Sequence, residues 1–348
     1  MNIVLIVPTG IGCEIGGHAG DAQPIAKLIG ACCDNLITHP NVVNASDINE
    51  MPENTWYVEG SQLDQFLEGK IYLKPVYQNK VLIVVNKADW QSINAVNAAR
   101  ASIGSNAEIL ELETPLELIA KIENGIATGE VKGWLELVEQ VENYNFDALG
   151  IVTPITISEK ILKDYFIYGG VNPVGGVEAI ASKLIANYIK KPVAHGPVDY
   201  GIKNFKEIVD PRKSVEIITE NFVHCILKGL NKAPKIVMKK NNNCLGAEDV
   251  DLMISPWRCW GPPHKACLEK EIPIMIVKEN KSVLNDTYPL ENDLIFVDNY
   301  IEAAGYLMVM KAGIHPSTVR RPLKQTKILK NNINLTSTFK TSNWTGKR

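Results

Sequence analysis

The chain has 348 residues, of which 45% are hydrophobic and 22% charged, and its net charge is −3. This length is sufficient for two domains with sizeable cores, and the small charge gives no overall attraction to nucleic acid or to an anionic membrane. No basic segment with a signal-type apolar run opens the chain, and no apolar stretch reaches the roughly eighteen residues of a membrane-spanning helix. The composition therefore predicts a cytoplasmic protein with no nucleic-acid and no membrane partner.

Seven cysteines are scattered along the chain without a CxxC pair, which excludes the usual structural zinc patterns. Reduced thiols in the cytoplasm are the expected state of such a set. The sequence thus requires neither a disulfide framework nor a cofactor.

The N-terminal segment joins a buried-strand pattern to a helix through a glycine-rich turn. Residues 3–7 form an unbroken apolar run, typical of a strand that is covered on both faces of a parallel sheet, and Pro8 ends it. Helical spacing follows from Ala22 to Ile29, with Asp21 as the predicted N-cap. The backbone N–H groups of the turn could hold an anion, and a purely structural turn is the alternative. The predicted ligand-binding residues of the turn are Thr9, Gly10, Gly12, Gly16, Gly17, His18 and Asp21.

Strand and helix patterns alternate through the first half of the chain, which predicts a largely parallel sheet. Residues 34–69 are predicted to be a loop-rich connector that ends in a short helix. That connector carries His39, Asn41 and Glu59, which are predicted to converge on the glycine-rich turn. The further predicted strands are 81–85, 108–112 and 147–153, and the predicted helices are 95–103, 116–126 and 133–141.

Residues 169–198 repeat the order of glycines, helix and strand seen at the N-terminus. Glu178 lies in the first turn of the predicted helix, where the helix dipole favours a carboxylate. His195 follows a short strand, at the edge of the sheet where ligands bind. Both are predicted catalytic residues, with helix capping as the alternative role of Glu178. The predicted ligand-binding residues here are Asn172, Gly175 and Gly176.

A second dense cluster of site-type residues spans 256–264, between a predicted strand at 249–255 and a predicted helix at 265–270. A thiol in the loop before a helix N-terminus has its thiolate favoured by the dipole, and Arg258 or His264 could add to this effect. Cys259 is therefore the predicted nucleophile, and packing is the alternative role, as for any free cysteine.

The C-terminal part contains a predicted buried strand at 272–277, a last strand at 295–298 and a last helix at 301–312. Residues 324–348 form a basic, polar tail. A mobile tail is the first interpretation of this composition, and a contact arm of a homo-oligomer is the second.

Several motifs together resemble a bacterial and cyanobacterial family known as domain of unknown function 3326, over residues 3–323. That family has no established reaction, so the resemblance implies kinship alone. The stretch DLMISPWRCWGPPHKACLEKEIPIMIV is similar to the substrate-activating subunits of glycine and proline reductases, which place a selenocysteine or cysteine in a strand-to-helix loop. This similarity implies that Cys259 takes the chalcogen position and His264 that of the nearby imidazole. The motifs of the family resemblance are VPTGIG, GGHAGDAQP, ITHPNVVN, YVEGSQLDQF, NPVGGVEAIASKLI, PVAHGPV and VDNYIEAAG.

The predicted fold is α/β, with two doubly wound, largely parallel-sheet lobes and a cleft between them. The predicted division is an N-terminal lobe at 1–150, a C-terminal lobe at 151–323 and the tail. The loops predicted to meet at the cleft are 9–21, 38–44, 172–178 and 256–264.

The predicted function is an enzyme for a small carboxylate-bearing, amino-acid-like metabolite, with Cys259 as nucleophile or base and His195 or His39 moving protons. Racemisation, elimination and reductive cleavage are all compatible with this set. A non-catalytic ligand-binding or regulatory protein is the alternative, followed by a nucleotide-dependent oxidoreductase and a metal enzyme. The metal alternative would use His18, Asp21, His39 and His195.

Overall fold

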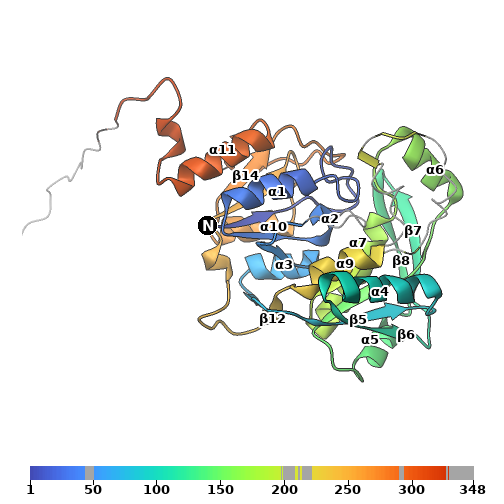
Figure 1. Ribbon diagram of the computed structural model, residues 1–348. Coiled ribbons are helices and arrows are strands. Elements are labelled where there is room, and N and C mark those ends of the chain that lie inside the picture. Colours follow the sequence, from blue (N-terminus) through green and yellow to red (C-terminus); the bar gives the residue numbers. More distant parts are fainter. Residues whose placement is uncertain are drawn as a thin grey trace, which may run out of the picture.

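Two parallel sheets with helices on both faces form the two lobes of the protein, which lie side by side in Figure 1. The computed structural model describes residues 1–43, 51–196, 198, 208–210, 212–213, 222–289, 294–326 and 328. The first lobe contains a six-stranded sheet in the order β15-β14-β13-β1-β2-β3, and the second contains a four-stranded sheet in the order β11-β9-β5-β6. The predicted α/β class with two largely parallel sheets is confirmed.

β1 (Asn2–Leu5) is an interior strand of the six-stranded sheet. Ile3 pairs in parallel with Leu252 of β13 on one side and with Leu36 of β2 on the other. Ile3 and Val4 are completely buried on opposite faces, which explains why this strand is an unbroken apolar run. The other strands of the sheet are β2 (Asn35–Thr38), β3 (Thr55–Tyr57), β13 (Leu252–Pro256), β14 (Ile274–Val277) and β15 (Leu294–Val297).

Helices cover both faces of this sheet. α1 (Gln23–Cys32) and α11 (Tyr300–Lys311) pack together on the face that receives Ile3. α3 (Gly60–Leu67) and α10 (Pro262–Glu269) pack together on the face that receives Val4. A short helix, α2 (Pro40–Val43), follows β2 directly.

The four-stranded sheet of the second lobe is also covered on both faces. α4 (Trp90–Ile103) and α9 (Phe222–Asn231) pack together on one face, and α7 (Gly175–Ile189) and α5 (Trp134–Val141) on the other. The strands are β5 (Lys80–Val85), β6 (Asn106–Glu111), β9 (Ala148–Val152) and β11 (Val193–His195).

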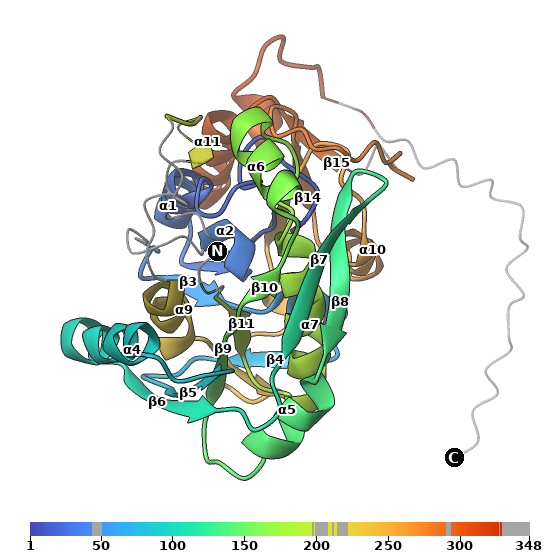
Figure 2. The same ribbon diagram turned by 90° about the vertical axis from the view of Figure 1, so that its right-hand side faces the viewer.

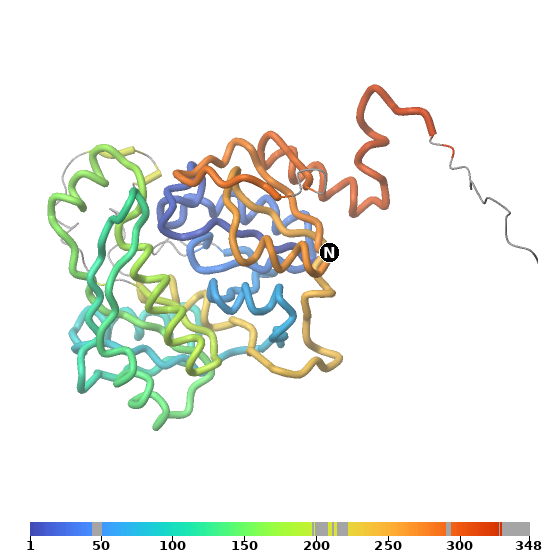
Figure 3. The backbone as a smooth tube through the Cα atoms, turned by 180° about the vertical axis from the view of Figure 1, so that it is seen from behind, coloured from blue at the N-terminus to red at the C-terminus, as the bar shows by residue number. Residues whose placement is uncertain are grey.

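The sheets divide the chain differently from the predicted boundary at residue 150. β13, β14 and β15 pair beside β1, so the first lobe is built from both ends of the chain, as the blue and orange segments of Figure 3 show. The middle of the chain forms the second lobe. The two crossings between the lobes pair with each other as the antiparallel strands β4 (Tyr72–Lys74) and β12 (Lys235–Val237). An interior strand such as β1 needs a hydrogen-bonded neighbour on each side. The order of the strands in the sequence does not determine which strands become those neighbours.

The predicted helix at 116–126 is wrong, because this segment forms the antiparallel strands β7 (Glu117–Glu123) and β8 (Ile126–Lys132). Asn124 and Gly125 have φ values of 52° and 78°, the left-handed pair of a tight hairpin turn. In Figure 2 this hairpin stands beside α7. β10 (Ile155–Thr156) adds a third strand in parallel with β7, and α6 (Glu159–Tyr168) follows it.

The connector at 34–69 was predicted to be loop-rich, but it contains β2 and β3, both of which join the six-stranded sheet. Of the predicted tail, the residues at 324–326 and 328 are exposed, and the rest lies outside the described residues. Short 3-10 helices occur at Ala247–Asp249 and Pro316–Thr318. In the part of the chain that the structure describes, the helices are too short or too polar to cross a membrane.

Gly176 provides a test of the packing between α7 and β8. A Cβ at this position would lie 2.1 Å from the backbone oxygen of Ala127, too close for any real contact. We expect Gly176→Ala to lower the free energy of unfolding by about 1–3 kcal/mol, as overpacking does, in urea denaturation.

Gly305→Ala is the matched control, because Gly305 lies within α11 and a Cβ there would meet no atom within 4 Å. Its expected effect is a gain of about 0.5–1 kcal/mol from helix propensity. Equal effects of the two substitutions would contradict the proposed contact.

Candidate functional site

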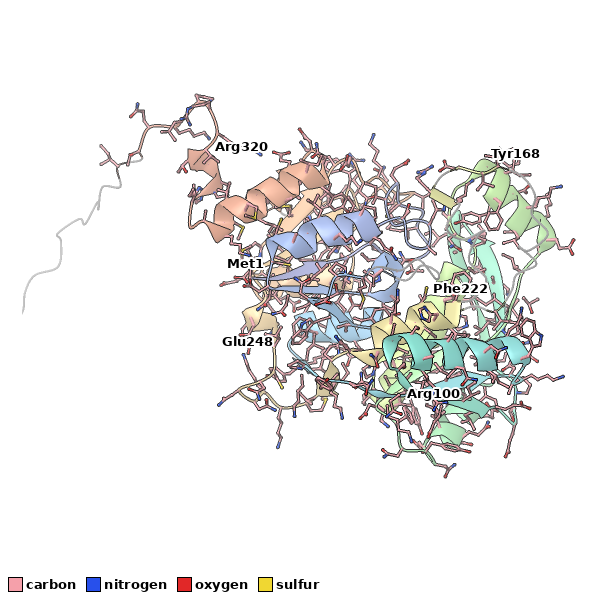
Figure 4. All side chains as sticks on the ribbon, in the orientation of Figure 1. Met1, Arg100, Tyr168, Phe222, Glu248 and Arg320 are labelled. Carbon is pink, nitrogen blue, oxygen red and sulfur yellow. The ribbon has the colours of Figure 1, made fainter. Side chains whose placement is uncertain are left out.

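A cavity of about 140 Å³ lies between the two lobes, at the ends of their parallel strands. One wall comes from the loops that follow β1, β2 and β3, and the other from α6, α7 and the end of β11. Ligands of α/β proteins bind at such strand ends. Phe222, at the start of α9, marks the place between the lobes in Figure 4. The residues that line this interlobe cavity are Thr9, Ala19, His39, Pro40, Asn41, Glu59, Gly60, Leu162, Tyr165, Phe166, Asn172, Val174, Glu178, Ala179, Ser182, His195 and Phe222.

Glu178 and His195 form a hydrogen-bonded pair in the cavity wall. The Nδ1 atom of His195 lies 3.0 Å from Oε1 of Glu178, and its Nε2 atom lies 3.2 Å from Oγ1 of Thr153. The imidazole side chain is only 1% exposed, whereas the Glu178 side chain is 22% exposed. The carboxylate is therefore the end of this three-residue chain that a ligand in the cavity can reach.

The protonation states of this chain follow from its donors and acceptors. An ionised Glu178 can only accept, so Nδ1 of His195 carries a proton, and Nε2 lies within hydrogen-bond distance of the Thr153 hydroxyl. Glu178 also lies in the first turn of α7, where the helix dipole stabilises a negative charge. The arrangement holds one charged carboxylate in one orientation at the cavity.

His39 is a neutral hydrogen-bond donor in the same cavity. The backbone N–H of Val7 donates to Nε2 of His39 over 3.0 Å, so the ring carries its proton on Nδ1. Burial lowers the pKa of His39 to about 4, and the ring is uncharged at neutral pH. A neutral imidazole N–H can polarise a ligand oxygen without adding a full charge.

Glu59 stabilises the start of a helix and also faces the cavity. Oε2 of Glu59 accepts from the backbone N–H groups of Ser61 and Gln62 at the start of α3. Burial raises the pKa of Glu59. Glu59 is thus both the N-cap of α3 and a nearly buried acid at the cavity.

The glycine-rich turn uses several of its amides within the protein. The N–H of Ile15 donates to Oδ1 of Asn280, and the N–H of Gly16 donates to Oδ1 of Asp21. Asp21 closes this turn, and the N-cap of α1 is Ala22 instead. A Cβ on Gly17 would lie 2.1 Å from the oxygen of Cys13. Tight packing therefore accounts for Gly17, and a left-handed backbone with φ of 82°, 55° and 84° accounts for Gly10, Gly12 and Gly16.

His18 supports the cavity from behind. Its Nδ1 atom lies 2.6 Å from the hydroxyl of Tyr165, a cavity residue on α6. Lys213 donates to the backbone oxygens of Tyr165 and Phe166, which fastens the C-terminal end of α6.

Cys259 lies outside the cavity. The residue is 1% exposed, and its Sγ atom lies 3.3 Å from the hydroxyl of Ser282. A thiol hydrogen bond with Cys13 lowers the pKa of Cys259 and raises that of Cys13. The loop at 256–264 thus contacts the glycine-rich turn, as the prediction requires, but through two buried sulfurs rather than across a cavity.

Arg258 and His264 serve local structure in that loop. The Arg258 guanidinium contacts the side-chain oxygen of Asn285. Nε2 of His264 lies 2.7 Å from the hydroxyl of Ser255, and its Nδ1 accepts from the N–H of Gly261 at the start of α10. Burial lowers the pKa of His264 to about 4. These bonds identify His264 as a helix-capping residue.

Some of the predicted site residues line the interlobe cavity, and the others lie outside it. Thr153 and Tyr165 were not predicted as site residues. Thr153 directly follows β9, and the helical spacing of Leu162, Tyr165 and Phe166 was their one signal. The predicted residues that line the cavity are Thr9, His39, Asn41, Glu59, Asn172, Glu178 and His195. Gly10, Gly175 and Gly176 lie at the junction of the lobes, and Gly12, Gly16, Gly17, His18, Asp21, Arg258, Cys259 and His264 do not line the cavity.

The metal alternative requires ligands that converge on one point. Among the described residues, no three His, Cys, Asp or Glu side chains form a group that could hold a metal ion. The set His18, Asp21, His39 and His195 therefore does not assemble into such a site.

The fold and cavity define a two-lobed α/β protein with a hydrogen-bonded carboxylate–imidazole pair in the wall of its interlobe cavity. The chain belongs to the family described as "Protein of unknown function (DUF3326)", whose model matches residues 2–320, so the family resemblance is confirmed. It is similar to an uncharacterized lipoprotein of Synechococcus sp., with 32% identity over 338 residues that cover 92% of this chain and 93% of the relative. No solved structure matches the chain significantly.

Three buried imidazoles make the stability depend on pH. Burial is the largest cause that lowers the pKa values of His18, His39 and His264 from 6.5 to about 4. In this pH window the unfolded chain binds more protons than the folded one, so stability is lost as the pH falls from 6.5 to 4. We expect the free energy of unfolding, measured in urea at each pH, to decrease through this window.

His264→Asn isolates one of these contributions, because its Oδ1 can still accept from the N–H of Gly261. The decrease between pH 6.5 and 4 should be smaller in this variant, by about a third of the part that the three imidazoles cause. An unchanged pH dependence would show that His264 does not titrate as its burial requires.

Proposed function

We propose that the protein is an enzyme that moves protons on a small polar metabolite bound in the interlobe cavity. Glu178 is the general base, and His195 and Thr153 are positioning residues behind it. The observation that carries this proposal is the hydrogen-bonded chain of these three side chains, whose most exposed end is the carboxylate. A base must reach the proton that it removes, and Glu178 lines the cavity.

The proposed step is the removal of a proton from a carbon next to a carbonyl or carboxyl group. The C–H bond breaks, its electron pair moves toward the ligand oxygen, and the proton goes to Glu178. The Nδ1–H group of His39 donates to the oxygen that gains negative charge. Return of a proton to the opposite face of the same carbon gives racemisation, with no external reductant.

Glu178 fits the role of the reactive group in the cavity better than Cys259 does. Cys259 has a lowered pKa, but its sulfur is enclosed by Ser282 and Cys13. A thiolate acts only on a ligand that it can contact. We therefore propose a packing role for Cys259 and acid–base chemistry without a cysteine nucleophile.

Hydrogen–deuterium exchange on carbon tests the catalytic role of Glu178. The protein is incubated in heavy water with a panel of small carbonyl and carboxyl metabolites, and loss of each C–H signal is followed by NMR. Glu178→Gln keeps the shape of the side chain and removes its basicity, so exchange should slow about 10²- to 10⁴-fold. Thr153→Val should cause a smaller loss together with a shifted pH profile.

Cys259→Ser is the control and should exchange at close to the wild-type rate. Loss of exchange in this variant, with retention in Glu178→Gln, would restore the cysteine mechanism. Binding of a panel compound without exchange in the wild-type protein would identify a non-catalytic ligand-binding protein instead.

We also propose that the chain acts in the cytoplasm with its N-terminal segment in place. The name of the Synechococcus relative calls that protein a lipoprotein. Lipidation at Cys13 after removal of the preceding residues would remove β1. β1 carries the pairing to both β2 and β13, so the sheet would be split.

The mass of the protein isolated from its native cell tests this proposal. We expect a chain that retains β1 and carries no lipid at Cys13, recovered in the soluble fraction. A chain that begins at a lipid-modified Cys13, recovered with membranes, would contradict it. Recombinant protein analysed in parallel is the control for adventitious cleavage.

A further inference from the structure

The carboxylate of Glu59 has one oxygen satisfied and one open. Its Oε2 atom accepts from the backbone N–H groups of Ser61 and Gln62 and from the Ser61 hydroxyl. Among the residues that the structure describes, no donor contacts Oε1, although Glu59 is only 4% exposed and lines the cavity. Oε1 is not among the fully buried side-chain atoms, so a ligand in the cavity can reach it, and a ligand that donates to it would be stabilising.

Asn41 presents a second acceptor on the same wall. Its Nδ2 group donates to the backbone oxygens of Val7 and Gly16, each over 3.0 Å. Both amide hydrogens are thus used, and the side-chain oxygen of Asn41 is the group left for a ligand. Glu178 adds a third acceptor, because His195 contacts only its Oε1 atom within the described structure.

The charge of the cavity wall has one sign. The described lining residues include Glu59 and Glu178 but no lysine or arginine. Two lysines lie close by without lining the cavity: Lys183 interacts favourably with the charge of Glu59, and the buried Lys213 donates to the backbone oxygens of Tyr165 and Phe166. A ligand with only negative charge would therefore be repelled, and a positive donor would form charge-assisted hydrogen bonds.

We propose that the ligand of the interlobe cavity carries a primary ammonium group, which donates to Oε1 of Glu59 and to the side-chain oxygen of Asn41. His39 then donates to the ligand oxygen beside the reacting carbon. This inference rests on the proposed function for the reacting end and adds the substrate class: a small amino acid, amino ketone or amino aldehyde.

Matched pairs of probes test this proposal by isothermal titration calorimetry. L-alanine is compared with L-lactate, and aminoacetone with hydroxyacetone, because the members of each pair differ in ammonium against hydroxyl. We expect the amine of at least one pair to bind at least about tenfold more tightly than its hydroxyl partner. If no amine binds more tightly than its partner, the proposal is overturned.

Glu59→Gln gives the structural control within this experiment. Glutamine retains an oxygen that can accept the cap hydrogen bonds of α3, but it removes the charge. Amine affinity should fall about tenfold in Glu59→Gln and hydroxyl affinity should stay within about twofold. Glu68→Gln, at the other end of α3, makes the same charge change outside the cavity and should alter neither affinity. An unchanged amine affinity in folded Glu59→Gln would also overturn the proposal.

The outcomes separate this inference from the proposed function. Amine binding that depends on Glu59, without carbon exchange in any variant, would retain the ammonium site and reject the enzyme. Exchange that depends on Glu178, on ligands without an amine preference, would retain the enzyme and reject the ammonium site.

Discussion

A contact among three backbone segments determines the geometry of the cavity. The backbone oxygen of Gly10 accepts from the N–H of Ala127, and a Cβ on Gly176 would fall within 2.1 Å of the Ala127 oxygen. A Cβ on Gly175 would likewise fall 2.6 Å from Cγ2 of Thr9. The loop after β1, the hairpin strand β8 and the start of α7 therefore touch at van der Waals distance. This close approach places the strand ends of one lobe opposite the first turn of α7 in the other.

The parallel sheets position the polar side chains of the cavity, because these side chains lie at or shortly after the ends of the strands. Thr9, His39 and Glu59 follow β1, β2 and β3, and His195 ends β11. These residues are far apart in sequence, but parallel strands of one sheet end at the same edge. Glu178, the candidate base, and Cys259, the candidate nucleophile, differ in their access to the cavity. Glu178 is exposed to it, whereas Cys259 has a favourable pKa shift and no route to a ligand.

Much of this arrangement could be predicted from the sequence, because the informative patterns are local. The apolar run at 3–7, the strand end before His195 and the first helical turn at Glu178 each identify an element and a candidate residue. The pairing between β1 and β13 could not be predicted, since no local sequence pattern indicates which distant strand pairs with β1. The hairpin at 117–132 was missed because its apolar residues also fit helical spacing, although Asn124 and Gly125 carried the turn signal. The buried contact of Cys259 is with Cys13, which lies 246 residues earlier in the sequence (259 − 13).

The location of a bound metabolite is the most direct measurement of the central claim. A crystal structure of the protein with a compound whose carbon it exchanges should show that compound in the interlobe cavity. We expect the Glu178 carboxylate within about 3–3.5 Å of the reacting carbon and the His39 ring hydrogen-bonded to the adjacent oxygen. A compound bound beside Cys259, with water in the interlobe cavity, would contradict it.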